Sequence, residues 1–533
     1  MKKIISVLLA ALMIFSCASV SFAANETNTK TPVIVVSGMG AFPTVNNETG
    51  ENVFPPSAET IIKTVLGAAP SLAASAVFNK WDLLGKYGAK PIHDLFEGMK
   101  CDENGNPVYN TSAKTFPGSA AQYDELKGGE SLEVAVLRAC ADEIGWENTY
   151  YFYYDWRMSA LDIADDLEKT IDRAMSETKS KKVSLFAMSF GGTITSAYLY
   201  KYGSNKLRTV VYASSAIYGT DLVGKLFSGN MEIKLDAIIN YLEEFLIGSD
   251  FAYKAVGLSR NIIAKYGKGA KKAIDAYLLS MLEALREPVY AKIFMDTFIR
   301  FPGVWGLMNG KCYEKAKEIM APYGNLSESF LKKTDEYMYN VQNKTDELIK
   351  AAEKNGTNVY IIGSYNYAGI PLTESSRNHS DCLIDTYLMT GYATVADYGK
   401  TLTSAADNSK KVCTDKTHSH LSTDGVIDAS TGILPERTWF IKNMRHVEYG
   451  YNQQSSKLAA WIATSETAVD VHTDSRFPQF VDMSRKTGAF TSLTENVEIP
   501  KDASQVQKNF LSKLDELLAK FIEFIRTHFF KAK

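Results

Sequence analysis

Cysteine and histidine are scarce in this chain of 533 residues, which contains six cysteines and seven histidines. So few cysteines over such a length exclude a small scaffold held together by disulfides. The formal net charge is only −3, and it becomes −5 if residues 1–23 are removed. A basic face for nonspecific nucleic-acid binding is therefore not expected. The chain also shows no convincing internal repeat and no low-complexity tract, and its composition is that of an ordinary globular protein.

Long apolar runs are absent after the first residues of the chain, which argues against a membrane-spanning helix in the remainder. Residues 1–23 contain two lysines, an apolar run at 4–15 and small residues up to Ala23, which is the pattern of a cleaved secretory signal peptide. Cys17 lies in a loose lipobox, so attachment to a lipid is the alternative. The chain is predicted to be secreted or held at the cell surface.

Removal of this signal leaves an odd number of cysteines, so at least one cysteine has no disulfide partner within the chain. Cys382 and Cys413 fall in one predicted loop region, and they are the first pair to consider for a disulfide.

The most informative stretch that is present is KKVSLFAMSFGGTITSAYL, residues 181–199. An apolar run ends at Ser189 and helical residues follow at once, which predicts a sharp turn between a strand and a helix. Such a nucleophile elbow holds a serine hydroxyl where a histidine can take its proton. Ala187 replaces the first glycine of the usual G-x-S-x-G pattern. A buried strand followed by an ordinary Gly-Gly turn also fits these residues.

Strand and helix patterns alternate around this elbow. Apolar or aromatic runs predict strands at 31–36, 149–154, 183–186, 207–213, 358–363 and 438–441. Apolar residues at steps of three and four predict an amphipathic helix at 158–174. This alternation is typical of a mostly parallel sheet covered by helices, so we expect a three-layer α/β core.

The alternation stops between residue 230 and about residue 354, where the sequence is nearly all helical. A block of this length between two core strands is best interpreted as an inserted cap. The predicted divisions are a signal peptide at 1–23, a core at 24–215 and 356–466, a helical cap at 216–355, and a C-terminal extension at 467–533. The extension contains an amphipathic helix at 508–530, whose pattern favours packing against the core or a partner over contact with a membrane.

An acid and a base for the serine follow later in the chain. Asp424 lies in a predicted Thr-Asp-Gly turn, and His446 follows the last predicted strand. The chain order Ser189, Asp424, His446 is the order of an orienting acid and a general base in folds with a nucleophile elbow. Asp428 is the alternative for the acid.

Backbone amides for an oxyanion hole are predicted at two turns. The Ser-Gly-Met-Gly segment at 37–40 follows the first predicted strand, and its glycines allow close approach to a reacting carbonyl. The N–H groups of Met39 and Phe190 would be the two donors. A plain turn between strand and loop is an equally good interpretation of 37–40 alone.

Four segments together resemble the lecithin:cholesterol acyltransferase family of α/β-hydrolases, which includes lysosomal phospholipases. They are YDWR at 154–157, the elbow, Phe301-Pro-x-x-Trp305, and Asp-Gly at 424–425. The resemblance is scattered over roughly 31–450. It implies an α/β-hydrolase fold, a three-layer sandwich with a mostly parallel sheet and a large helical cap. The sequence departs from the family at Met188, where a histidine is usual, and at Ser37, where proline is common.

The resemblance also implies roles for the residues already singled out: Ser189 as nucleophile, Asp424 as orienter, His446 as base, and Met39 and Phe190 in the oxyanion hole. The predicted activity is that of a secreted lipase, esterase or phospholipase that cleaves lipid esters through an acyl-enzyme, without a cofactor. The alternatives are an acyltransferase that passes the acyl group to an alcohol and a noncatalytic binding protein on a hydrolase scaffold. The predicted partner is a lipid or other acyl ester, with transient contact to a membrane or micelle and none to nucleic acid.

A metal site is the remaining alternative from the sequence. His418 and His420, with Asp415 or Asp424, have side chains that suit zinc. Their spacing is not diagnostic, and a surface loop is the favoured interpretation, so no metal is predicted.

Overall fold

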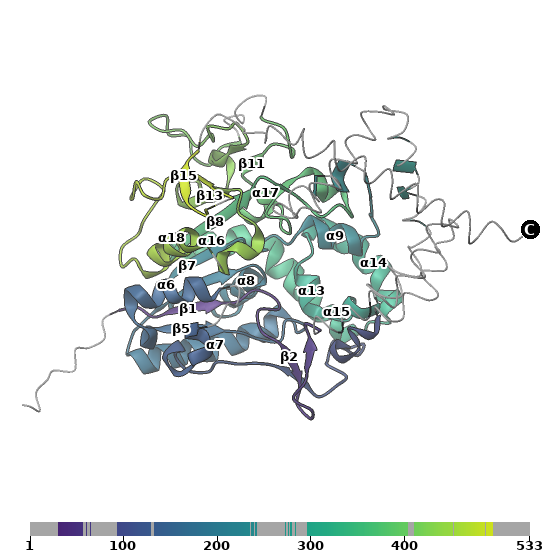
Figure 1. The fold of residues 1–533 in the computed structure, drawn as a ribbon. Helices are drawn as coiled ribbons and strands as arrows, with labels where there is room; N and C mark the ends of the chain where they lie inside the picture. Colours follow the sequence, from purple (N-terminus) through teal and green to yellow (C-terminus); the bar gives the residue numbers. More distant parts are fainter. Residues whose placement is uncertain are drawn as a thin grey trace, which may run out of the picture.

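The fold is known from a computed structural model of the chain (Figure 1). The structure describes residues 30–56, 93–128, 133–234, 236–238, 240–241, 296–402, 410–450, 452–485 and 487–493, with single positions at 60, 64, 272, 275, 276, 278, 279 and 283. The predicted signal peptide, the lipobox cysteine and the amphipathic helix at 508–530 lie outside the described residues.

The centre of the described chain is an eight-stranded sheet in the order β15-β14-β13-β8-β7-β6-β1-β5. All neighbouring strands are parallel except β15, which runs antiparallel to β14. Its strands are β1 (Val33–Val36), β5 (Thr149–Phe152), β6 (Val183–Met188), β7 (Leu207–Ala213), β8 (Asn358–Tyr365), β13 (Thr438–Lys442), β14 (Phe480–Met483) and β15 (Phe490–Ser492). The six predicted strands are thus all present.

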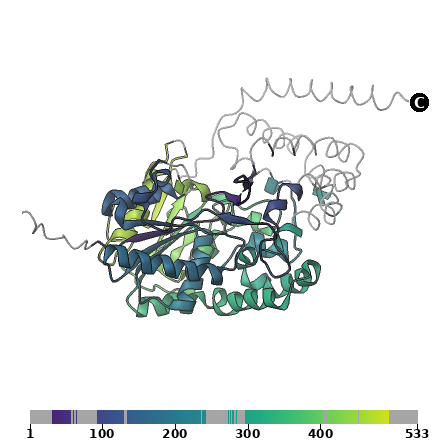
Figure 2. The ribbon, with the colours of Figure 1, turned by 90° about the horizontal axis from the view of Figure 1, so that it is seen from below.

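Alternate residues of each strand face opposite helical layers, because successive side chains of a strand point to opposite sides. In β1, Ile34 and Val36 belong to the hydrophobic cluster on one side, whereas Val33 and Val35 belong to the cluster on the other side. Both faces of the sheet are covered by helices (Figures 1 and 2). Burial on both sides explains why the strands are continuous apolar runs in the sequence.

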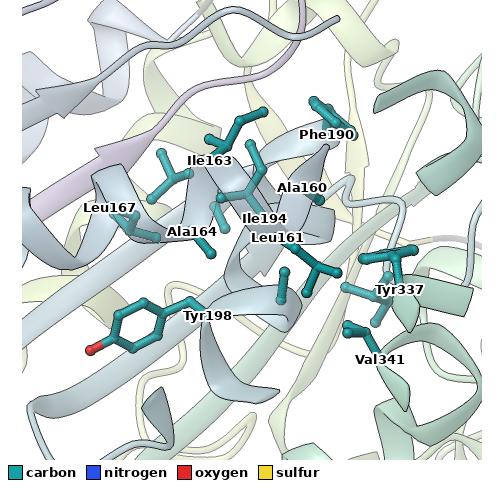
Figure 3. Close-up of a cluster of buried hydrophobic side chains, with 14 of the residues drawn as sticks. Ala160, Leu161, Ile163, Ala164, Leu167, Phe190, Ile194, Tyr198, Tyr337 and Val341 are labelled. Atoms are coloured by element: carbon teal, nitrogen blue, oxygen red, sulfur yellow. The ribbon is translucent and has the colours of Figure 1, made fainter. Parts of the chain in front are cut away.

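The first layer contains α7 (Ala160–Thr178), α8 (Phe190–Tyr202) and α16 (Thr345–Lys354), and the second contains α6 (Val134–Ile144) and α18 (Gln453–Thr464). Helix α7 corresponds to the amphipathic helix predicted at 158–174. Its apolar face meets α8, where Ile163 and Leu167 lie close to Ile194 (Figure 3). Packing between α7 and α8 fixes the helix that starts immediately after Ser189.

Helices also fill the described part of the segment between β7 and β8. They are α9 (Asp221–Phe227), α12 (Asp296–Phe298), α13 (Pro302–Gly306), α14 (Tyr313–Gly324) and α15 (Glu328–Asn340), followed by α16. The other elements are shorter: β2 (Thr44–Asn46), β3 (Asn52–Phe54), β4 (Thr111–Ala113), α5 (Asp124–Gly128), β9 (Tyr367–Ala368), β10 (His379–Ser380), α17 (Thr386–Met389), β11 (Thr394–Val395) and β12 (Ile427–Asp428). Single 3₁₀ turns that matter below are η10 (Pro435–Arg437) and η11 (His446–Gly450).

The mostly parallel sheet between two helical layers, with a serine elbow after β6, is the α/β-hydrolase fold, as predicted. The sheet nevertheless extends beyond residue 466, because β14 and β15 come from the segment that the sequence analysis assigned to a C-terminal extension. β14 alternates half-buried and buried residues, and β15 is largely exposed. They therefore lack the long apolar runs that reveal the central strands.

The disulfide between Cys382 and Cys413, the first pair that the sequence analysis considered, is not present. None of the five cysteines within the described ranges forms a disulfide. Cys413 Sγ instead lies 3.2 Å from the Glu436 carboxylate and 3.6 Å from a ring nitrogen of His418. Two cysteines in the same predicted loop region need not lie close enough to form a disulfide, which requires a specific geometry.

Candidate active site

Ser189 lies on a strained turn at the carboxyl end of β6. Its backbone has φ 55° and ψ −122°, in the positive-φ region that non-glycine residues rarely occupy. The two glycines that follow allow the turn to fit against its neighbours. A Cβ on Gly191 would lie 2.3 Å from the carbonyl oxygen of Val36, and one on Gly192 would lie 2.5 Å from Ser215 Cβ. These contacts explain why small residues follow the serine.

His446 begins η11 just beyond the carboxyl end of β13, on the same edge of the parallel sheet as Ser189. Its Nδ1 lies 2.7 Å from Asp381 Oδ2, and its backbone N–H donates to the carbonyl oxygen of Asp381 at 2.8 Å. Both side chains are buried. Burial alone would lower the pKa of His446, but the carboxylate of Asp381 and its hydrogen bond raise it above its ordinary value.

Asp381 is itself fixed by the loop after β10. Its Oδ1 accepts hydrogen bonds from the backbone N–H groups of Leu383 at 3.0 Å and Ile384 at 2.8 Å, and the residue is fully buried. This leaves Oδ2 for the imidazole. Asp381 thus holds the position that an orienting acid takes beside a catalytic histidine.

The prediction that Asp424 pairs with His446 is corrected by these contacts. Asp424 Oδ2 accepts from Lys442 Nζ at 2.8 Å and from the Tyr365 hydroxyl at 3.0 Å, whereas Oδ1 accepts from Ser422 Oγ at 2.7 Å. The side chains of Asp424 and Lys442 are buried together. Asp424 therefore forms a buried ion pair with Lys442, at the end of β13, and not with His446.

Asp428, the alternative acid, accepts hydrogen bonds from the backbone N–H and the hydroxyl of Ser430 at 3.1 and 2.5 Å. The Asp-Gly turn misled the sequence analysis because Gly425 does adopt a positive φ of 67°, as a turn glycine should. Asp381 satisfied the same chain order, after β8 and before His446, but no turn signal marked it.

Glu133 is a buried acid beside the site that the sequence analysis missed. It is fully buried at the start of α6, and its Oε1 accepts from the N–H of Gly38 at 2.8 Å. Its Oε2 accepts from the hydroxyls of Tyr151 at 2.7 Å and Ser37 at 3.1 Å. Burial raises the pKa of Glu133 despite these donors, and its charge contributes to the raised pKa of His446.

The loop held by Glu133 approaches Ser189 closely. A Cβ on Gly38 would lie 3.0 Å from Ser189 Cβ and 3.2 Å from Glu133 Oε1, so only glycine fits there without a shift. The N–H of Gly38 is occupied by its hydrogen bond to Glu133, and the next amide along the loop is the N–H of Met39. Phe190 is the first residue of α8, and its N–H has no acceptor within the helix. The assignment of Met39 and Phe190 to an oxyanion hole stays a prediction.

No hydrogen bond joins Ser189 Oγ to His446 among the contacts of these two described residues. Nucleophile and base often come into hydrogen-bond contact only when a substrate is bound.

Two of the segments that carry the family resemblance pack against each other. The guanidinium of Arg157 is buried and pairs with Asp155, with Nη2 2.6 Å from Oδ2. Trp156 packs edge-on against Phe301, with ring centres 5.6 Å apart. The N–H of Gly303 donates to the carbonyl oxygen of Arg157 at 3.1 Å. Trp156 is therefore a packing residue and Arg157 forms a buried ion pair, and YDWR joins the core to α13.

The other buried histidines have different surroundings. His379 is buried, and neither of its ring nitrogens has a hydrogen-bond partner among the described residues. His420 is also buried, so it does not lie in the surface loop that the sequence analysis favoured. It belongs to a cluster before the amino end of β13, described below.

Comparisons with known proteins give little similarity. No family model matches the sequence, and no curated protein matches it. Among solved structures, the Tle4–Tli4 complex is similar over 81% of this chain and 97% of that chain, with a TM-score of 0.36 and 10% identity. A serine hydrolase from Cycloclasticus zankles has a TM-score of 0.23 and 10% identity, over 65% of this chain and 86% of that chain. Similarities of this size support no conclusion about function, which has to come from the residues of this chain.

Within the residues that the structure describes, none of the helices has both the length and the apolar character required to cross a membrane.

Proposed function

We propose that the protein is a secreted serine hydrolase that cleaves carboxylic esters with an apolar acyl group, using Ser189 as nucleophile, His446 as base and Asp381 as orienting acid. The observation that carries this proposal is the buried hydrogen bond between His446 and Asp381 at the sheet edge that also carries the strained elbow of Ser189. Positive φ at a serine is costly, and such strain is concentrated at functional sites.

In this mechanism, the Nδ1–H of His446 donates to Asp381, which leaves Nε2 to accept the proton of Ser189 Oγ. The serine oxygen attacks the ester carbonyl, and the resulting oxyanion is stabilised by the N–H groups of Met39 and Phe190. Collapse of this tetrahedral intermediate breaks the ester bond, and the imidazolium of His446 gives its proton to the leaving alcohol. Water then attacks the acyl-enzyme with His446 as base, and Ser189 is regenerated.

An apolar acyl group is supported by aromatic side chains near the Ser37–Gly40 loop. A Cβ on Gly40 would lie 3.5 Å from the ring of Phe54, which is half-buried. Phe54 packs against Trp156 and Phe96, and Phe96 packs against Phe298. Half-buried rings beside the loop that approaches Ser189 suit a hydrocarbon chain better than a polar substrate.

A lipid ester is the substrate class that this aromatic surface and the resemblance to the lecithin:cholesterol acyltransferase family jointly favour. Membrane or micelle contact would then be transient, during substrate uptake. Transfer of the acyl group to an alcohol in place of water needs the same three side chains, so product analysis with and without an added alcohol distinguishes the two reactions.

A fluorophosphonate probe tests the proposal directly. We expect it to label the folded protein at one serine, and we expect Ser189→Ala to abolish both labelling and hydrolysis of p-nitrophenyl esters. Ser329→Ala, on an exposed position of α15, is the matched control and should behave like the unmodified protein. Equal labelling or equal esterase activity in Ser189→Ala and the unmodified protein would refute the assignment and favour a noncatalytic scaffold.

A further inference from the structure

Four potential metal ligands converge before the amino end of β13. They are the Sγ of Cys413, the Nε2 atoms of His418 and His420, and a carboxylate oxygen of Glu436, and all lie within 4.8 Å of one another. His418 Nε2 lies 2.8 Å from Glu436 Oε1 and 3.0 Å from His420 Nε2. His420 Nε2 lies 3.1 Å from the same carboxylate oxygen. One sulfur, two imidazole nitrogens and one oxygen form the donor set that Zn²⁺ binds in proteins.

The separations are close to those around a tetrahedral zinc ion. Zn–N distances of about 2.0 Å and a Zn–S distance of about 2.3 Å imply ligand–ligand distances of roughly 3.3 to 3.6 Å. The distance from Cys413 Sγ to His418 Nε2 is 3.6 Å, and the distance from Sγ to Glu436 Oε1 is 3.2 Å. The contacts of Glu436 Oε1 with Cys413 and the two imidazoles, and the contact between the two imidazoles, must each open by at most about half an ångström.

An amide behind His420 fixes the tautomer that a metal requires. Gln479 Nε2 donates to the carbonyl oxygens of Pro435 at 2.7 Å and Thr438 at 3.0 Å, so its Oε1 must face His420. That oxygen lies 2.7 Å from His420 Nδ1, which must therefore carry a proton. In the neutral ring the other nitrogen, Nε2, has a free lone pair that points into the cluster. This is the outer support typical of a metal-binding histidine.

Hydrogen bonds alone satisfy this cluster poorly. With its proton on Nδ1, a neutral His420 presents an acceptor at Nε2 to the acceptor oxygen of Glu436. The single Nε2–H that His418 can offer is shared between two acceptors, Glu436 Oε1 and His420 Nε2. A cation removes this conflict because it accepts all four lone pairs at once.

Two further residues hold the ligands in place. His472 Nε2 lies 3.1 Å from Glu436 Oε2, which keeps Oε1 directed at the cluster. The backbone N–H of Cys413 donates to the carbonyl oxygen of Ser430 at 3.1 Å, which fixes the loop that carries the sulfur. The ligands thus stand on a supported framework and not on an isolated surface loop.

We propose that Cys413, His418, His420 and Glu436 bind one structural zinc ion. Four protein ligands fill a tetrahedral shell and leave no position for a substrate, which is the mark of a structural site. Glu436 precedes β13 and His446 follows it, so the ion lies at the opposite edge of the sheet from Ser189. The zinc ion joins the 413–420 loop to the sheet and takes no part in ester cleavage.

The test uses the complete mature chain, freed of metal with EDTA under reducing conditions and then titrated with Zn²⁺ against a chromophoric chelator. We expect one equivalent to bind and the thermal unfolding temperature to rise. Loading with Co²⁺ should give the intense visible bands of a tetrahedral complex and a near-ultraviolet charge-transfer band from a thiolate. Absence of Zn²⁺ binding, or the weak spectrum of octahedral cobalt, would overturn the proposal without the use of any variant.

Matched cysteine variants locate the site. Cys413→Ser should lose the charge-transfer band, whereas Cys312→Ser, at a half-buried cysteine of the η5 turn (Gly310–Cys312), should keep it. His472→Ala removes an outer partner and should weaken Zn²⁺ binding by about tenfold without changing the stoichiometry. Persistence of the band in Cys413→Ser would refute the ligand set. Ester hydrolysis at a temperature where the metal-free protein is folded should not change on Zn²⁺ removal, so this test is independent of the proposed function.

Discussion

Strand β13 has an imidazole–carboxylate group near each end, and the two groups are built for different chemistry. Beyond its carboxyl end, His446 Nδ1 contacts the carboxylate of Asp381 at 2.7 Å. Before its amino end, His420 Nδ1 contacts the amide oxygen of Gln479, also at 2.7 Å. A carboxylate behind an imidazole stabilises its protonated form and suits proton transfer, whereas an amide oxygen fixes the proton on Nδ1 without adding charge and suits a metal ligand. The partner of Nδ1, more than burial, therefore distinguishes the two histidines.

The largest effect is expected from removal of the charge behind His446. Asp381→Asn should lower kcat for a soluble p-nitrophenyl ester by a factor on the order of 10³ to 10⁴, because the amide favours the wrong tautomer and no longer stabilises the imidazolium. Asp424→Asn, assayed at low temperature where it is folded, should keep kcat within about threefold of the unmodified value. The opposite ranking would return the orienting role to Asp424 and remove the contrast between the two ends of β13.

The next effect is on stability. Asp424→Asn should lower the free energy of unfolding in urea by about 3 to 5 kcal/mol, because it leaves the buried ammonium of Lys442 without its carboxylate. The double variant Asp424→Asn with Lys442→Met removes both charges and should recover most of this loss. If the single variant is as stable as the unmodified chain, the buried ion pair is not what holds Asp424 away from His446.

These contrasts also show how far the sequence alone could lead. The central strands and α7 follow from apolar periodicity, and Ser189 follows from a local turn that a short pattern can describe. Asp381 does not, because its role depends on a loop that brings it to His446 across the sheet edge. Glu133 and the cluster around Glu436 are likewise formed by residues from separate segments. Neither propensity nor spacing encodes such contacts, and edge strands such as β15 lack the burial that produces a clear pattern.

A third buried histidine sharpens the comparison because it has neither kind of partner. Burial lowers the pKa of His379 to about 4, while in the unfolded chain it is about 6.5. Between these values the unfolded state binds more protons, so this group's contribution to stability is present above about pH 6.5 and is lost as the pH falls toward 4. At pH 5 the loss is about 2 kcal/mol.

His379→Phe should therefore unfold with a smaller difference in free energy between about pH 7 and about pH 5 than the unmodified chain, measured by urea titration at both values. The other titrating groups are common to both proteins and cancel in this comparison. An unchanged difference would mean that His379 is protonated in the folded state or hydrogen-bonded to water.

The smallest effect concerns the loop beside the nucleophile. Glu133→Gln should lower kcat by about tenfold, because one of its two oxygens becomes an NH₂ group that faces either the Gly38 N–H or the hydroxyls of Tyr151 and Ser37, all of which are donors. Loss of the negative charge should also lower the pKa of His446, to whose raised value Glu133 contributes. The acidic limb of the profile of kcat/KM against pH should then move to lower pH.

Glu143→Gln, at an exposed position of α6, is the control and should leave both kcat and the acidic limb unchanged. A fall in kcat without a shift of the limb would limit Glu133 to the geometry of the 37–40 loop, and no change in either would show that Asp381 alone sets the charge around His446.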